Sequence, residues 1–148
     1  MAQELPSDFK EFLNLLRLRG VRYLLIGGYA VGYHGYPRAT GDMDIWVAVS
    51  PENADRAIET VREFGFSTPD LVPDLFLREQ SVVRMGIPPA RIEILTTISG
   101  VSFEECYERR VDATLDGVEV PIISLPDLIA NKQASGRYKD LMDLEHLS

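Results

Sequence analysis

Three acidic residues have the type and spacing to bind a divalent cation: Asp42, Asp44 and Glu93. Because alternate side chains of a strand point to opposite faces, Asp42 and Asp44 share one face, whereas Met43 and Ile45 occupy the other. If the strand that carries Glu93 pairs beside them, three carboxylates converge. Hard oxygen ligands of this kind suit Mg²⁺, which also takes phosphate and water ligands. An Asp-x-Asp pair alone is also typical of a solvated strand start.

A pair of glycines precedes the acidic residues. Gly27 and Gly28 follow an apolar run and open a short helical segment. A backbone without side chains can approach a phosphate closely, and a helix N-terminus offers free N–H groups to an anion. A tight turn between strand and helix explains the glycines equally well. Arg38 and Thr40 stand just before Asp42, where Arg38 suits a phosphate contact, a carboxylate contact or an exposed loop.

The elements that must position these residues alternate along the chain. Apolar spacing and capping residues predict helices, the first capped by Ser7, over 7–20, 29–35, 50–64, 102–110, 124–136 and 138–147. Apolar or alternating runs predict strands over 21–26, 43–49, 81–85, 91–96, 111–115 and 118–123. We therefore expect one domain over residues 1–148, with a mixed β-sheet flanked by helices, of the α/β or α+β class.

The composition is that of an ordinary globular protein with an acidic surface. The chain has 148 residues, 45% of them hydrophobic, and a net charge of −8. This charge argues against a basic stripe for nucleic-acid binding. No apolar run approaches the roughly 20 residues that cross a bilayer, so we expect no membrane association. A single cysteine, Cys106, and the lack of a signal-peptide pattern favour a cytoplasmic location.

Taken together, these residues resemble the nucleotidyltransferase superfamily of the DNA polymerase β type. The pattern of that family is a hydrophobic strand, Gly-Gly or Gly-Ser, a spacer, an acid-x-acid pair and a third acid on a later strand. Here the pattern is matched by Ile26-Gly27-Gly28, Asp42-x-Asp44 and Glu93. The third acid of the family is usually Asp, so Glu93 departs from the pattern by one methylene group. The resemblance implies the nucleotidyltransferase fold.

The C-terminal sequence SLPDLIANKQASGRYKDLMDLEHL resembles small bacterial nucleotidyltransferase-like proteins, including abortive-infection toxins of toxin–antitoxin pairs. In those relatives a helical Lys and a Lys/Arg-Asp element face the nucleotide. A salt-bridged surface helix is the alternative explanation. With the residues above, the predicted nucleotide-binding set is Gly27, Gly28, Arg38, Thr40, Lys132, Arg137, Lys139 and Asp140.

The resemblance implies transfer of a nucleoside monophosphate from an NTP to a hydroxyl acceptor. Asp42, Asp44 and Glu93 are then the catalytic residues and the ligands of Mg²⁺ or Mn²⁺. The acceptor stays open among RNA, protein and a small molecule such as an antibiotic, and the biological role among toxin, antitoxin and resistance protein. A non-catalytic nucleotide- or partner-binding module of the same fold is the alternative. A homodimer or a cognate partner protein can complete acceptor recognition in so short a chain.

Overall fold

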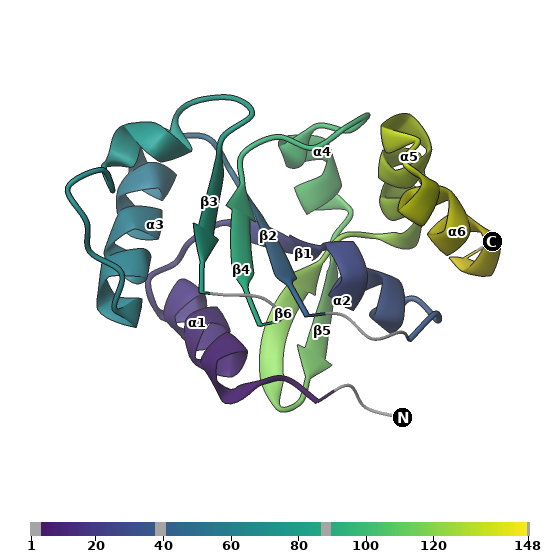
Figure 1. The fold of residues 1–148 in the computed structure, drawn as a ribbon, viewed down its shortest axis with the longest axis horizontal. Helices are drawn as coiled ribbons and strands as arrows, with labels where there is room; N and C mark the ends of the chain where they lie inside the picture. Colours follow the sequence, from purple (N-terminus) through teal and green to yellow (C-terminus); the bar gives the residue numbers. More distant parts are fainter. Residues whose placement is uncertain (1–3, 38–40, 87–89, 148) are drawn as a thin grey trace.

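The computed structural model describes residues 4–37, 41–86 and 90–147. Within these residues, six strands form one mixed sheet in the order β3-β4-β2-β1-β6-β5 (Figure 1). The strands are β1 (Tyr23–Ile26), β2 (Met43–Val47), β3 (Val82–Met85), β4 (Ile92–Leu95), β5 (Val111–Leu115) and β6 (Val118–Ile122). The helices are α1 (Ser7–Leu18), α2 (Gly27–Tyr33), α3 (Pro51–Phe64), the 3₁₀ helix η1 (Pro73–Phe76), α4 (Phe103–Glu108), α5 (Leu125–Ser135) and α6 (Tyr138–Leu147). The expected mixed sheet flanked by helices is confirmed.

The pairing of the central strands brings the ends of three strands together at one end of the sheet. Strand β2 runs antiparallel to β1 and parallel to β4. The end of β1 therefore lies beside the starts of β2 and β4. Strand β1 is also parallel to β6, and the outer strands β3 and β5 run antiparallel to their neighbours.

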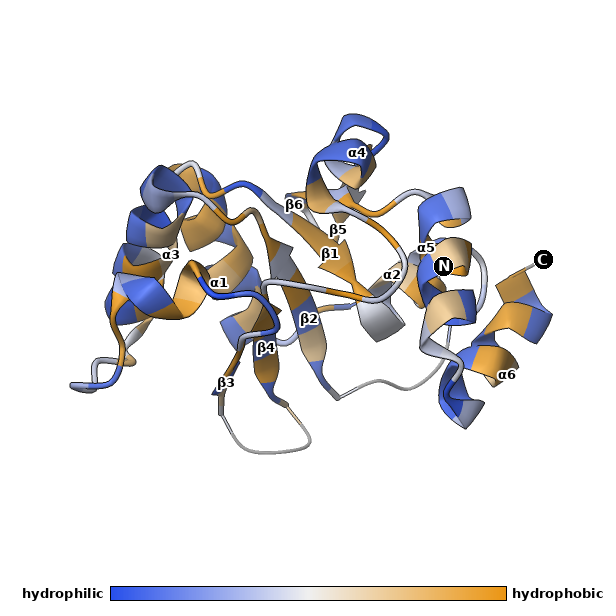
Figure 2. Cartoon of the chain, turned by 90° about the horizontal axis from the view of Figure 1, so that it is seen from above, coloured by the Kyte–Doolittle hydropathy of each residue, from blue (hydrophilic) through white to orange (hydrophobic). Residues whose placement is uncertain are grey.

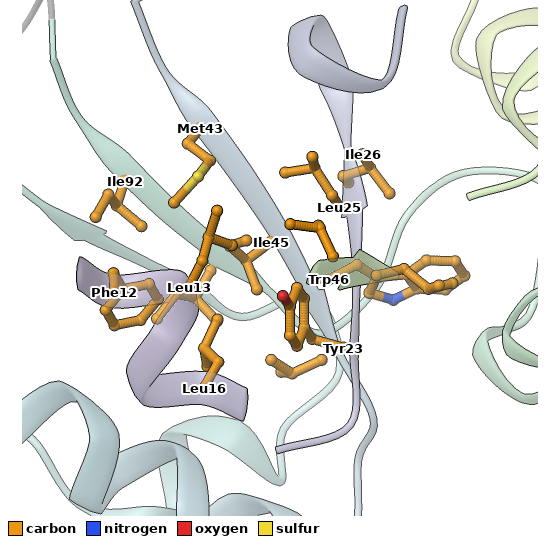
Figure 3. Close-up of a cluster of buried hydrophobic side chains, with 14 of the residues drawn as sticks. Phe12, Leu13, Leu16, Tyr23, Leu25, Ile26, Met43, Ile45, Trp46 and Ile92 are labelled. Atoms are coloured by element: carbon orange, nitrogen blue, oxygen red, sulfur yellow. The ribbon is translucent and has the colours of Figure 1, made fainter. Parts of the chain in front are cut away.

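Helix α1 packs on one face of this sheet and closes the main core. Its buried side chains, which include Phe12, Leu13 and Leu16, lie against apolar side chains of β1, β2 and β4 (Figure 3). Alternation along β2 sends Ile45 to this face and Trp46 to the other. There the Trp46 ring packs edge-on against Phe103 of α4, with ring centroids 5.2 Å apart. Both faces near the middle of β2 are therefore filled.

Hydropathy follows the same arrangement. The central strands are largely apolar, whereas polar residues cover the outer sides of α1 and α3 (Figure 2). None of the helices in the described ranges has the length and apolar character needed to cross a bilayer.

Capping residues explain where several helices begin and end. The hydroxyls of Ser50 and Ser124 accept hydrogen bonds from backbone N–H groups in the first turns of α3 and α5. Gly65 and Gly136 end these two helices with positive φ angles of 116° and 64°. The expected cap at Ser7 is wrong: Pro6 occupies that position, and its carbonyl accepts from the Lys10 N–H, which places Ser7 inside the helix.

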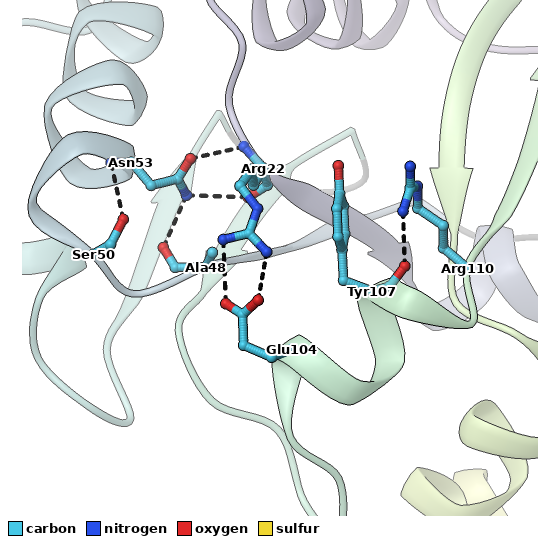
Figure 4. A network of polar contacts seen from close by, with 7 residues as sticks. All are labelled: Arg22, Ala48, Ser50, Asn53, Glu104, Tyr107 and Arg110. Atoms are coloured by element: carbon cyan, nitrogen blue, oxygen red, sulfur yellow. Dashed lines mark hydrogen bonds and ion pairs between the residues drawn. The ribbon is translucent and has the colours of Figure 1, made fainter.

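A buried side chain of α3 holds the opposite end of the central strands in place. Asn53 Oδ1 accepts from the Arg22 N–H at 2.7 Å, and Asn53 Nδ2 donates to the carbonyls of Arg22 and Ala48 at 3.1 and 2.8 Å (Figure 4). The Arg22 guanidinium in turn pairs with Glu104 of α4. These bonds join the start of β1 to the end of β2, and so support the register that the two strands keep along their length.

Candidate active site

The register of the sheet places the three acidic residues on one wall. Asp44 lies opposite Ile26 of β1 and opposite Glu93 of β4, and Asp42 directly precedes β2. The intervening residue Met43 is buried on the α1 face. The expected pairing of the Glu93 strand beside the aspartates is confirmed. Asp42, Asp44 and Glu93 are called the acidic cluster below.

The acidic cluster lines a pocket of about 730 Å³ between the sheet and the helices α5 and α6. The other predicted residues that line it are Gly27, Gly28, Lys132, Arg137, Lys139 and Asp140. Arg38 and Thr40 lie outside the described residues. The pocket also has lining residues that the sequence analysis did not predict as site residues: Ile26, Gly41, Leu95, Thr97, Ile98, Ser99, Asn131 and Ser135. Carboxylates thus occupy the sheet wall, and cationic side chains project from the helical wall.

Gly27 gives the carboxylate of Asp44 its space. The φ angle of Gly27 is +69°, in the left-handed region that disfavours side chains. A Cβ atom at this position would lie 2.2 Å from Asp44 Oδ2. The glycine is therefore required both by its backbone conformation and by its close approach to the acidic cluster.

The pKa of Asp44 shows the electrostatic cost of this arrangement. Burial, followed by repulsion from Glu93 and then Asp42, raises the pKa of Asp44 to about 6 from an ordinary 3.8, although Lys139 and Lys132 act in the opposite direction. The ionised carboxylate is thus less stable in the pocket than in water. A cation placed beside it would remove this cost.

The donor chemistry of the acidic cluster fits Mg²⁺ or Mn²⁺, because carboxylate oxygens are the protein ligands that these ions prefer. In residues 4–37, 41–86 and 90–147, however, no three acidic, His or Cys side chains are gathered around a common point as metal ligands. The guanidinium of Arg91 instead lies between two carboxylates of the acidic cluster. Its Nη2 is 3.1 Å from Asp42 Oδ2 and 2.9 Å from Glu93 Oε1.

Arg91 is a functional candidate that the sequence analysis did not select. It stands two residues before Glu93, so strand alternation places both side chains on one face of the sheet. That signal was present in the sequence.

A buried ion-pair network builds the helical wall. The Lys132 side chain is only 6% exposed, and its Nζ lies 2.9 Å from Asp140 Oδ1 and 3.0 Å from Asp143 Oδ2. Asp140 also accepts hydrogen bonds from the Ser135 hydroxyl and from Arg137 Nε. Burial alone would raise the pKa of Asp140, but the bonds from Ser135, Lys132 and Arg137 outweigh it and hold that pKa at about 2.

The predicted lysines of the helical wall therefore differ in how available their charge is to a ligand. The ammonium of Lys132 is engaged by two buried carboxylates. Lys139 is exposed, lines the pocket and forms no ion pair within the described residues, while its charge favours the ionised form of Asp44. Lys139 is thus the pocket lysine whose charge is available to a ligand.

Another glycine brings the loop after β4 against α5. Gly100 has a φ of +81°, and a Cβ atom there would lie 2.4 Å from the Cβ of Ala134. Asn131 Nδ2 donates to the Ser99 carbonyl at 2.9 Å. These contacts fix the loop that lines the pocket with Thr97, Ile98 and Ser99.

Comparison with known proteins gives matches among solved structures. No family model and no curated protein match the sequence. TM1012 of Thermotoga maritima, provisionally named a nucleotidyltransferase, is similar with a TM-score of 0.61 and 17% identity, over 93% of this chain and 88% of that one. The lincosamide antibiotic adenylyltransferase LnuA, with lincomycin bound, is similar with a TM-score of 0.60 and 14% identity, over 97% of this chain and 96% of that one.

A third structure is the antibiotic-resistance factor ANT(2'')-Ia, with a TM-score of 0.61 and 13% identity, over 95% of this chain and 80% of that one. At these identities the likeness lies in the arrangement of the backbone, and it extends over nearly the whole chain. The named neighbours do not include an abortive-infection toxin, and that part of the resemblance stays a prediction. The sheet order, the pocket position and these similarities together show that the chain has the nucleotidyltransferase fold.

Proposed function

We propose that this protein transfers a nucleoside monophosphate from an NTP to a hydroxyl group of an acceptor. The observation that carries the proposal is the pairing of Asp44 with Glu93 on one pocket wall, opposite Lys139, which forms no ion pair within the described residues. Nucleotidyltransferases are among the proteins that share this fold.

The reaction makes one bond and breaks one bond. The acceptor oxygen attacks the α-phosphorus of the NTP, the bond from that phosphorus to the bridging oxygen breaks, and pyrophosphate leaves. Asp42, Asp44 and Glu93 would hold Mg²⁺ or Mn²⁺, which supplies positive charge against the triphosphate. The Glu93 carboxylate accepts the proton of the acceptor hydroxyl. Gly27 and Gly28 let phosphate oxygens approach the backbone, and Lys139 offsets the charge that develops on pyrophosphate.

We favour a small hydroxyl-bearing molecule as the acceptor. The net charge of −8 repels polyanions at long range, which disfavours RNA, and it attracts cationic molecules. LnuA and ANT(2'')-Ia, both of similar fold, are named for antibiotic adenylylation and antibiotic resistance.

Label transfer tests the activity. The protein is incubated with Mg²⁺ or Mn²⁺ and each α-labelled NTP, in turn with aminoglycosides, lincosamides, RNA and a protein extract. Glu93→Gln is expected to lower the transfer rate by about 10²-fold, because the proton acceptor is lost. Asp112→Asn is the control, since Asp112 is exposed on β5 and pairs with Arg110 rather than with the pocket. Binding of NTP without pyrophosphate release would contradict the transferase and favour a nucleotide-binding module.

The two lysines of the helical wall should respond differently to substitution. Lys132→Met is expected to lower the free energy of unfolding by about 3–5 kcal/mol, because the buried carboxylates of Asp140 and Asp143 would both lose the ammonium that lies between them. Lys139→Met should change it by less than about 0.5 kcal/mol. It should also weaken NTP binding about tenfold through loss of a charged contact to phosphate. Urea denaturation and calorimetric NTP titration measure the two effects, and equal destabilisation by both variants would contradict the assignment.

A further inference from the structure

Arg91 occupies a fixed place within the acidic cluster. The Arg91 carbonyl accepts a hydrogen bond from the Met43 N–H at 2.8 Å, directly before the pair formed by Met43 and Ile92. This bond places Arg91 beside Asp42. Two residues further along the same face of the sheet, Glu93 pairs with Asp44. The position of Arg91 therefore follows from the register of the parallel strands, and not from a chance contact of a long side chain.

The contact of Arg91 with the cluster is also suited to release. Both carboxylates are held by the same nitrogen, Nη2, whereas a paired fork of two nitrogens would be the stronger arrangement. Arg91 Nε is buried and has no hydrogen-bond partner in the described part of the chain. The side chain is still 28% exposed toward solvent. An unsatisfied buried donor costs free energy, and this cost lowers the barrier to moving the side chain away.

We propose that Arg91 is a built-in counter-ion of the acidic cluster, which a divalent cation must displace and which then pairs with the phosphates of the incoming NTP. The proposal rests on the proposed function. A metal ion on Asp42 and Glu93 needs oxygens that now lie against Arg91 Nη2, which donates a hydrogen bond to Asp42 Oδ2 and forms an ion pair with Glu93 Oε1. Asp42 and Glu93 line the pocket, so a guanidinium displaced from them remains close to it, where an anionic triphosphate suits its charge. Metal and NTP therefore bind with positive cooperativity, since each removes a cost of binding the other.

Substitution of Arg91 should consequently shift two affinities in opposite directions. In Arg91→Gln, Mn²⁺ alone is expected to bind about three- to tenfold more tightly, because two ion pairs no longer compete with it. A non-hydrolysable NTP analogue should bind about tenfold more weakly, because a charged phosphate contact is lost. Titration calorimetry measures the analogue, and the electron-spin signal of free Mn²⁺ measures the metal. Thermal unfolding confirms that the variant is folded.

Arg84→Gln is the matched control. Arg84 of β3 contacts the same atom, Glu93 Oε1, but at 3.5 Å and with a side chain that is 56% exposed. The Arg84→Gln substitution removes the same charge. An equal gain in Mn²⁺ affinity would therefore mean that any loss of positive charge near the cluster has this effect, and it would overturn the proposal. Unchanged or weaker Mn²⁺ binding by Arg91→Gln would overturn it as well, and would leave the proposed function intact. Absence of Mn²⁺ binding in every protein, with and without the analogue, would instead overturn the metal-dependent function itself.

Discussion

Asp44→Asn is expected to lower nucleotidyl transfer by about 10³-fold or more and, in metal-free buffer, to make the folded protein more stable. The loss of activity follows because charge stabilisation by a metal site contributes several kcal/mol and this residue is the central carboxylate of the acidic cluster. The gain in stability follows from the raised pKa. Removing a carboxylate that is costly to ionise relieves repulsion with Glu93 and Asp42.

The pH dependence of that gain has a defined sign. The folded pKa of Asp44 is about 6 and its ordinary value is 3.8, so the folded state retains the proton over a range where the unfolded chain loses it. Wild-type stability is therefore lost as pH rises from about 4 to about 6, and the deficit persists above that range. The Asn variant should be more stable than the wild type by up to about 3 kcal/mol at pH 8 and by almost nothing at pH 3.5. Urea denaturation in EDTA at both pH values, with Asp112→Asn alongside, measures this; a less stable variant at pH 8 would contradict it.

Gly27→Ala should damage both folding and activity. The positive φ of this residue disfavours any side chain by about 1–2 kcal/mol. In addition, the new Cβ would meet Asp44 Oδ2 at 2.2 Å, so the carboxylate must move. A displacement of about 1 Å in a catalytic group can cost about 10²-fold in rate, and we expect at least that loss.

Gly20→Ala separates the two causes. Gly20 has the same φ of +69°, and the nearest atom to its Cβ would be Arg56 Nη1 at 3.9 Å. This control should show the backbone penalty alone, with unchanged transfer activity. Thermal unfolding and label transfer on both variants give the comparison. If Gly27→Ala retained full activity, Asp44 would not need its observed position.

The sequence predicted the sheet wall of the pocket because strand alternation is a local property. Asp42 and Asp44 share a face whatever lies beside them, and the buried Ile92 and Ile94 orient Glu93 in the same way. Alternation also places Trp46 on the Asp44 face. Only the packing of α4 determines that the Trp46 indole is buried in the core and does not line the pocket.

The helical wall could not be predicted in the same detail, because its contacts are long-range. Whether Lys132 faces a ligand or a carboxylate depends on how α6 folds back after Gly136, and that turn brings Asp140 and Asp143 onto its ammonium. The close approach of Gly100 to Ala134 likewise joins segments that share no local pattern. The role of Arg91 depends on the pairing of β2 with β4, although its face could be read from the sequence.

The in-step pairing of β2 and β4 has a consequence for how such a chain can diverge. Inserting or deleting one residue inside either strand would turn its carboxylate into the core and bring out Met43 or Ile92 in its place. A substitution, by contrast, changes one side chain and leaves the register of the strands unchanged. We therefore expect related chains to keep the number of residues in these two strands constant even where most other residues differ. Common ancestry would then be recognised from the spacing of these residues more readily than from overall sequence identity.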